Sequence, residues 1–260
     1  MEFPWPDIQQ ITVALLVFLR ISAMLFLLPV LGHQLVPAQV KVGLIVLLTL
    51  LIYPLVQDKV TLIPLEPIAF AAIALQEILI AGALAMFAQL TFTAAQFAGQ
   101  IMSFQMGMTV ANVFDPVTRS QQSVISQLSI TLAMLLWVSA GAHHIFLYAM
   151  IDSFTLFPID QPWHFPGLMA LTDAAANMFV LSLKIAAPIM LLLFFVYIAL
   201  GLVSRAVPQI QVFFVSFPLT VGLGLLTFGL GMPAFIYLMS DAFTALSGQV
   251  PLFLRHLSGV

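Results

Sequence analysis

Charged residues are so widely spaced in this sequence that most of the chain lies in long uncharged runs. The runs include 20 residues after Arg20, 37 residues after Glu77 and 35 residues after Arg205. A helix that crosses the hydrocarbon core of a bilayer needs about 20 mostly apolar residues. Several runs reach that length, so the spacing of charges predicts an all-α integral membrane protein.

The uncharged runs divide into about six long hydrophobic helices. We expect spans at roughly 8–31, 38–56, 67–98, 122–150, 174–203 and 209–238. A seventh stretch, 239–254, is amphipathic and reads either as an interfacial helix or as part of a bent hairpin. The first helix is expected to start after Asp7, because an acidic residue suits a helix N-terminus. A membrane barrel is not expected, since runs such as 44–48 lack the alternation that its strands require.

Composition excludes several classes of protein. Only 7% of the 260 residues are charged, against about 25% in an ordinary soluble domain, so the chain has too few charges to cover a surface that faces water. A net charge of −3 gives no basic surface for nucleic acid. The absence of cysteine excludes disulfides and thiolate metal sites. The few Lys and Arg residues leave the membrane orientation open.

Three charges fall inside the expected helices and are candidate functional residues, because a charge within a membrane segment is costly. Arg20 and Lys184 follow only short uncharged runs, so their long side chains are expected to reach an interface. Glu77 lies deeper in its segment and is the better candidate for a buried polar contact.

The third segment carries two distinct helical faces. Small residues share an arc of about 80° at 100° per residue, and they are Ala74, Ala81, Ala85, Ala88, Ala95 and Gly99. An adjacent face of about 60° carries Gln89, Thr93, Gln96 and Gln100. Small residues let helices approach closely, and unpaired amides are unfavourable in lipid. These faces serve either packing within the chain or contact with neighbouring subunits or a wet conduit; the helix-compatible run of 67–106, longer than a bilayer needs, favours the second.

The stretch 99–123 is unusually apolar for a connection. It contains three methionines within seven residues, Met102, Met106 and Met108, and methionine suits surfaces that close around varied or moving partners. The stretch is either a re-entrant loop packed on its own helices or a plug within a pore.

Catalytic and metal-binding motifs are not found. His143 and His144 are adjacent and therefore point about 100° apart on a helix, unlike an i, i+4 metal pair. Gly222 and Gly224 form a G-x-G with no preceding strand, so they read as helix-packing glycines. We therefore expect neither an enzyme nor a metal or other cofactor.

Several short motifs are spread over nearly the whole chain. They are Arg20-Ile21-Ser22, Pro29-Val30-Leu31-Gly32, residues 36–44, Phe104-Gln105-Met106-Gly107, Ala111-Asn112-Val113-Phe114-Asp115-Pro116, His143-His144 with Ser153-Phe154, Arg205-Ala206-Val207-Pro208-Gln209 and Phe217-Pro218-Leu219. In their order and spacing, the chain resembles the FliR family of flagellar biosynthetic proteins and the related subunits of virulence type III secretion systems.

The resemblance implies a role in protein export. FliR-like proteins join FliP-like and FliQ-like subunits in the gate through which unfolded flagellar proteins leave, with FlhB-like and FlhA-like export proteins as further partners. It implies one embedded domain, 1–260, at the flagellar basal body in the bacterial inner membrane. Residues 1–173 would be FliP-like, and 174–260 would form a FliQ-like hairpin. The loop 104–119 matches the family's channel plug, with Phe104, Met106, Gly107, Met108, Asn112, Phe114 and Asp115 as its main residues.

Two other classes remain as alternatives. A small secondary transporter would use Glu77 and the glutamine face as its substrate or proton site, but such folds usually show paired half-repeats, which this sequence lacks. A purely structural membrane scaffold would need no plug.

Overall fold

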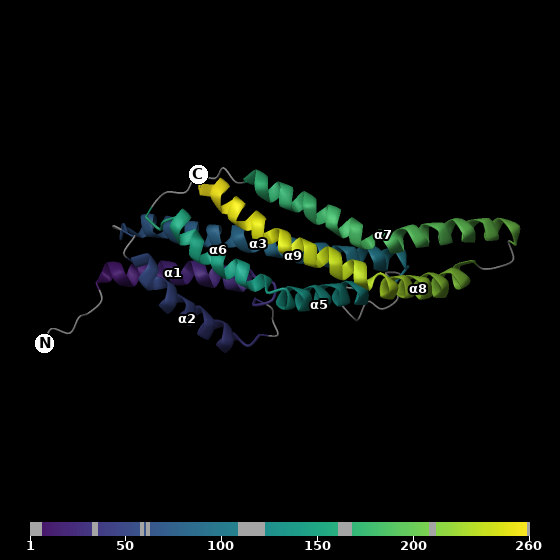
Figure 1. The fold of residues 1–260 in the computed structure, drawn as a ribbon, viewed down its shortest axis with the longest axis horizontal. Coiled ribbons are helices and arrows are strands. Elements are labelled where there is room, and N and C mark those ends of the chain that lie inside the picture. Colours follow the sequence, from purple (N-terminus) through teal and green to yellow (C-terminus); the bar gives the residue numbers. More distant parts are fainter. Residues whose placement is uncertain are drawn as a thin grey trace. The chain divides into compact units, whose positions relative to one another are not determined.

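The structure is a computed structural model that describes residues 7–32, 36–57, 60, 63–108, 123–160, 168–207 and 212–258. Every regular element within these ranges is an α-helix, as the sequence predicts (Figure 1). The helices are α1 (Ile8–Leu27), α2 (Ala38–Gln57), α3 (Pro67–Gln105), α5 (Val124–Ser139), α6 (Ala142–Leu156), α7 (Leu168–Ala206), α8 (Val212–Leu230) and α9 (Met232–Ser258).

Four of the described helices, α1, α2, α3 and α7, are each long and apolar enough to cross a membrane. The pairs α5–α6 and α8–α9 pass the same test together but bend by 68° and 56°, so the described residues offer up to six spans. Helix α1 begins directly after its N-cap Asp7, where the sequence predicted its start. The chain is an all-α integral membrane protein.

Two of the expected spans are wrong in detail, because each is broken into two helices. The predicted span 122–150 breaks at Gly141, whose φ of +66° is a left-handed conformation that glycine adopts without strain. The predicted span 209–238 breaks at Gly231, between α8 and α9. Residues 239–254 continue α9, so this stretch is the arm of a bent hairpin and not a separate interfacial helix.

Helix α3 is one uninterrupted helix of 39 residues. At 1.5 Å per residue its length is about 58 Å, well beyond the roughly 30 Å hydrocarbon core. The helix ends at Gln105, later than the predicted span end at 98. This length agrees with the long helix-compatible run seen in the sequence.

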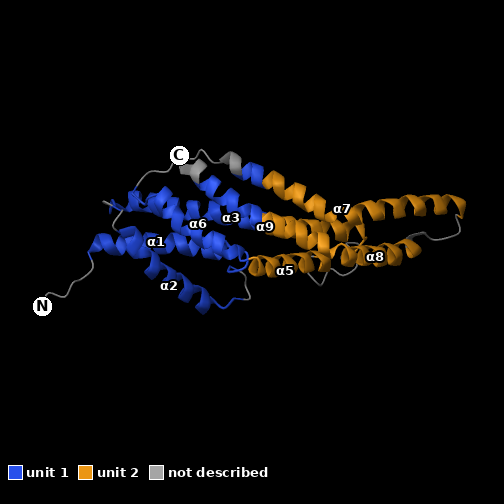
Figure 2. Ribbon diagram, in the orientation of Figure 1, with its two compact units in different colours: residues 1–90, 141–174, 244–260 blue, residues 91–140, 175–243 orange. Residues whose placement is uncertain are grey.

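The chain divides into two compact units (Figure 2). The first comprises residues 1–90, 141–174 and 244–260. One face of α1 forms much of its core, with Leu16, Val17, Ile21 and Met24 buried. Phe87 of α3 packs there on Phe253 of α9, with ring centroids 4.4 Å apart.

The second unit comprises residues 91–140 and 175–243. Phe92 of α3 is its central aromatic residue, with ring centroids 6.0 Å from Trp137 of α5 and 5.5 Å from Phe243 of α9. Phe97 packs edge-on against Phe179 of α7 at 5.6 Å. Aromatic contacts of this kind add to the stabilisation from buried area.

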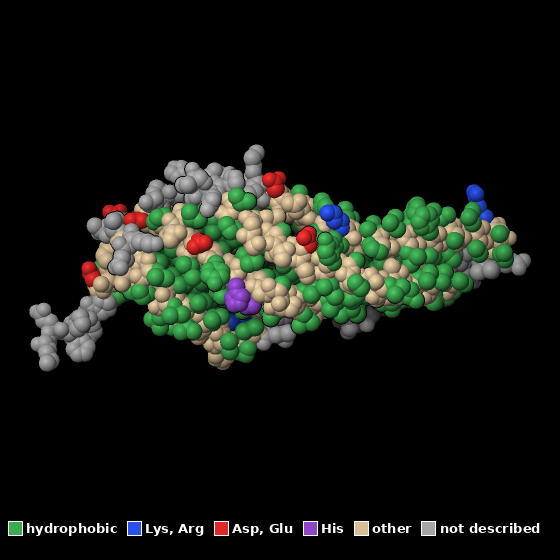
Figure 3. Space-filling view, viewed as in Figure 1, with side chains coloured by type: hydrophobic (Ala, Val, Ile, Leu, Met, Phe, Trp, Pro, Cys, Tyr) green, Lys and Arg blue, Asp and Glu red, His purple; other side chains and the backbone are tan. Residues whose placement is uncertain are grey.

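Apolar side chains dominate the molecular surface. Hydrophobic side chains are spread along the whole length of the face shown in Figure 3, with few Lys, Arg, Asp or Glu side chains among them. Large apolar residues are exposed along α7 and α8, including Phe194, Phe195, Leu202, Phe214 and Leu226. Such continuous apolar surface needs lipid or protein around it.

Candidate functional site

The end of α3 is a tightly hydrogen-bonded turn. The backbone N–H of Gly107 donates to the carbonyl of Phe104 at 3.0 Å, and that of Met108 donates to the carbonyl of Ser103 at 3.1 Å. Gly107 has φ of +78°. This pair of bonds with a left-handed glycine is the Schellman motif that ends helices. The chain therefore turns away from α3 at Gly107.

Side chains from the C-terminal helices hold the same turn. The hydroxyl of Tyr197 in α7 donates to the carbonyl of Gln105 at 2.6 Å. The single hydroxyl proton of Thr220 in α8 is shared between the carbonyl of Met106, at 3.1 Å, and that of Phe217 in its own helix, at 3.2 Å. The last carbonyls of a helix lack partners within the helix, so these two bonds satisfy groups that would otherwise need water.

Met106 locks the turn against α8. Its side chain is fully buried and lies over Gly224, where an added Cβ would meet its Cε at 2.7 Å and its Sδ at 2.9 Å. The glycine thus makes room for the methionine. Gly224 is a helix-packing glycine, as the sequence predicted, but the prediction is wrong for Gly222, where an added Cβ would meet nothing within 4 Å.

The structure corrects the start of the predicted plug loop, 104–119. Phe104 belongs to the last turn of α3 and is 69% exposed, and Met106 is a buried anchor rather than a loop residue. Gly107 and Met108 lie half-buried in the turn. The other predicted plug residues, Asn112, Phe114 and Asp115, lie outside the described residues.

The small-residue face of α3 is covered by the chain itself. The proposed subunit-packing residues Ala81, Ala85, Ala88, Ala95 and Gly99 are buried. A Cβ on Gly99 would lie 2.9 Å from the backbone nitrogen of Ser126 and 3.0 Å from the carbonyl oxygen of Ile125, so α5 approaches α3 at this point. The expectation that these five residues contact neighbouring subunits is wrong, because they offer no surface to a neighbour.

The glutamine face is different, because it lies at the surface of the chain. Gln89 and Gln100 are exposed, and Thr93 and Gln96 are half-buried. The hydroxyl of Ser126 donates to the backbone carbonyl of Gln96 at 2.9 Å. Apart from the half-buried Ala74, the small-residue face is buried, so the glutamine face is the one that presents side chains to a partner or to water.

The intramembrane charges also fall into two classes. Arg20 does not reach an interface: it is buried and forms an ion pair with Glu77, so the expected snorkelling is wrong for this residue. Glu77 occupies the buried polar contact that its position indicated. Lys184 is exposed on α7 and borders a small cavity with Pro188 and Gly231.

Sequence reasoning missed the residues that complete these sites. Ser153 and Phe157 bind Arg20, and Tyr197 and Thr220 bind the end of α3. Ser153 stood among the family motifs without a role. A tyrosine or threonine within an apolar helix gives only the general signal that its hydroxyl needs an acceptor.

Comparison with known proteins gives a family match and several relatives that share one name. The family model of bacterial export proteins, family 1, matches residues 11–246. The flagellar biosynthetic protein FliR of Bacillus subtilis (strain 168) is 32% identical over 236 residues, covering 88% of this chain and 90% of the relative. FliR of Pectobacterium carotovorum subsp. carotovorum is 34% identical over 233 residues, covering 89% and 84%. FliR of Escherichia coli (strain K12) is 32% identical over 234 residues, covering 88% and 89%.

Proposed function

Because this chain belongs to the bacterial export proteins, family 1, alongside relatives named flagellar biosynthetic protein FliR, we propose that it is a core subunit of the flagellar type III protein export gate. It is a membrane-embedded protein of flagellar biosynthesis. In this proposal it acts without catalysis, in the bacterial inner membrane at the flagellar basal body. FliP-like and FliQ-like subunits complete the channel, FlhB-like and FlhA-like proteins bind it, and unfolded flagellar proteins pass through it.

Two parts of the chain have separate roles in the proposed gate. Residues 1–173 act as a FliP-like part, and residues 174–260 act as a FliQ-like hairpin that contains most of α7 and all of α8 and α9. The compact units do not follow this boundary, since each contains segments from both parts.

We propose that the segment from Gly107 to 119 is the plug that closes the channel. The observation that carries this proposal is the fixed turn at its start. A plug has to remain beside the pore and still be able to move. The bonds from Tyr197 and Thr220 fix the point at which the segment leaves α3, and Met108 supplies a deformable apolar side chain at its start.

The exposed glutamine face supports a role beside other subunits. Side-chain amides in an otherwise apolar helix carry both donors and acceptors. We propose that Gln89, Gln96 and Gln100 bond to a FliP-like neighbour or to water in the channel. The buried alanine face takes no part in this contact.

Assembly is the first test. The full chain is co-expressed with FliP-like and FliQ-like partners, extracted in mild detergent and examined by native mass spectrometry. We expect a discrete complex that contains one copy of this chain. A stable monomer or homodimer that binds neither partner would contradict the proposed export gate. It would favour the alternative of a small secondary transporter.

The plug is tested in that complex by replacing residues 109–118 with a Gly/Ser segment of equal length. This change keeps Gln105–Met108 and the loop length, so the anchors of α3 are retained. We expect the inner membrane to become permeable to small ions while the subunit composition is unchanged. A correctly assembled complex with unchanged conductance would contradict the plug and leave the gate assignment standing.

A further inference from the structure

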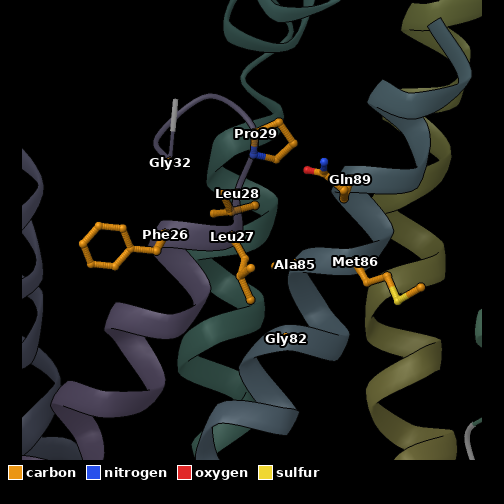
Figure 4. A pocket seen from close by; sticks show the side chains of 9 residues that line it. All are labelled: Phe26, Leu27, Leu28, Pro29, Gly32, Gly82, Ala85, Met86 and Gln89. Carbon is orange, nitrogen blue, oxygen red and sulfur yellow. The ribbon is translucent and has the colours of Figure 1, made fainter. Parts of the chain in front are cut away.

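A groove in the first compact unit lies between the end of α1 and the middle of α3 (Figure 4). Its volume is about 600 Å³, within the range of small-molecule sites. Leu28 and Ala85 form buried parts of its lining, while Phe26, Leu27 and Met86 are exposed at its walls. The groove is therefore apolar and open at the surface.

Polar groups lie at two separate places around the groove. The amide of Gln89 points toward Pro29 across the opening (Figure 4). The ammonium of Lys41, in the first turn of α2, donates to the carbonyl of Gly32 at 2.8 Å and lies 5.8 Å from the ring centroid of Phe26. Lys41 is not part of the lining, but Gly32 and Phe26 are, so a cation lies beside the groove.

The position of this cation along the membrane segments is also informative. α1 ends at Leu27 and α2 begins at Ala38, so the cation lies where one apolar helix ends and the next begins. Lysines at such ends place their ammonium at the level of the lipid headgroups. In the part of the chain that the structure describes, one of the three donors of Lys41 is used, at Gly32.

We propose that this groove binds an anionic phospholipid, with its phosphate at Lys41 and one acyl chain along Leu27 and Met86. The apolar groove suits an acyl chain of such a lipid, and the ammonium of Lys41 suits its phosphate. Clusters between transmembrane helices that combine basic and apolar side chains bind anionic headgroups by the same chemistry. This site does not depend on the plug, but it borders Gln89, which the proposed gate places at a subunit contact.

The test measures binding of phosphatidylglycerol and phosphatidylcholine to the full chain in detergent by native mass spectrometry. Lys41→Gln is expected to weaken phosphatidylglycerol binding about fivefold, because one lysine near the membrane surface contributes that factor. Phosphatidylcholine binding is expected to be unchanged. Lys41→Arg keeps the charge and is expected to restore binding, and Arg205→Gln, at the end of α7, is the charge control.

A second variant tests the apolar part without touching the cation. Met86 is 44% exposed, and the larger side chain of Met86→Trp is expected to fill the groove. Leu79→Trp is the control, because Leu79 lies on the same helix and is similarly exposed, at 41%. Met86→Trp is expected to remove binding of phosphatidylglycerol, whereas Leu79→Trp leaves it intact.

Three results would overturn the proposal. Binding that is unchanged in both Lys41→Gln and Met86→Trp would mean that the lipid binds elsewhere. If both lipids bound equally and Lys41→Gln changed neither, the groove would not recognise an anionic headgroup. A wild-type chain that binds neither lipid, together with loss of a co-purifying subunit in Met86→Trp, would show that a protein helix fills the groove.

Discussion

Arg20 of α1 and Glu77 of α3 form an ion pair that is almost completely removed from solvent, with the two side chains 1% and 0% exposed. A third helix completes the environment of the guanidinium. Ser153 lies 3.3 Å from one of its nitrogens, the carbonyl of Phe157 lies 3.0 Å from another, and the ring of Phe154 lies 4.2 Å from its central carbon. The pair therefore fixes α1, α3 and α6 at one point of the first unit.

Removing one partner of this pair is expected to destabilise the chain strongly. Glu77→Gln leaves the Arg20 charge buried without a countercharge, which costs about 3–5 kcal/mol in comparable pairs. The measurement is the amount of monodisperse protein that remains after heating in detergent. Glu66→Gln is the matched control, because Glu66 is exposed just before α3. Equal thermal stability of the two variants would show that the pair contributes nothing.

The close approach of α5 to α3 is expected to tolerate no side chain at Gly99. A Cβ there would lie 2.9 Å from the backbone nitrogen of Ser126, and overpacking of this kind costs about 1–3 kcal/mol. Gly99→Ala should therefore lower thermal stability even when the chain is expressed alone. Gly43→Ala is the control, since a Cβ at Gly43 meets nothing within 4 Å. If Gly99→Ala is harmful only in the presence of partner subunits, the contact belongs to the assembly instead.

The helices could be predicted because their signals are local: uncharged runs set the spans. The predicted end of α3, at 98, lies seven residues before the observed end at Gln105. The breaks at Gly141 and Gly231 were missed because the chain stays apolar across them. A glycine indicates a break only when its neighbours force a bend, and that depends on tertiary packing.

The partners of the buried groups could not be predicted, because they are distant in sequence. Glu77 is 57 positions from Arg20, and Ser153 is 133 positions from it. Tyr197 and Thr220 reach carbonyls that are 92 and 114 positions away. Sequence reasoning identified Glu77 as buried from its depth in a span, but it placed Arg20 at an interface because nothing local shows a countercharge.

Strain introduced at Gly107 is expected to loosen the proposed plug. A residue with a Cβ at φ of +78° costs about 1–2 kcal/mol, so Gly107→Ala weakens the turn without removing any hydrogen bond directly. We expect Gly107→Ala to increase ion leakage through the assembled complex above that of the wild type. Gly107→Asn is expected to leak less than Gly107→Ala, since asparagine adopts this conformation more readily. Gly222→Ala in α8 is the control, because its Cβ would meet nothing within 4 Å. Identical leakage in all three variants would show that the conformation at Gly107 does not affect closure of the channel.

The two hydroxyl anchors are expected to act together on the same turn. Tyr197→Phe and Thr220→Val each remove one hydrogen bond to a carbonyl at the end of α3. A bond of this kind contributes about 0.5–1.5 kcal/mol, so each variant should raise the open fraction of the channel about two- to tenfold. Single-channel recordings of the assembled complex measure this fraction, and Tyr237→Phe, at an exposed position of α9, is the control. Because both anchors hold adjacent carbonyls, the double variant should differ from the sum of the single effects. Strictly additive effects would show that the two bonds hold independent structures, and no effect from either variant would show that the turn stays closed without them.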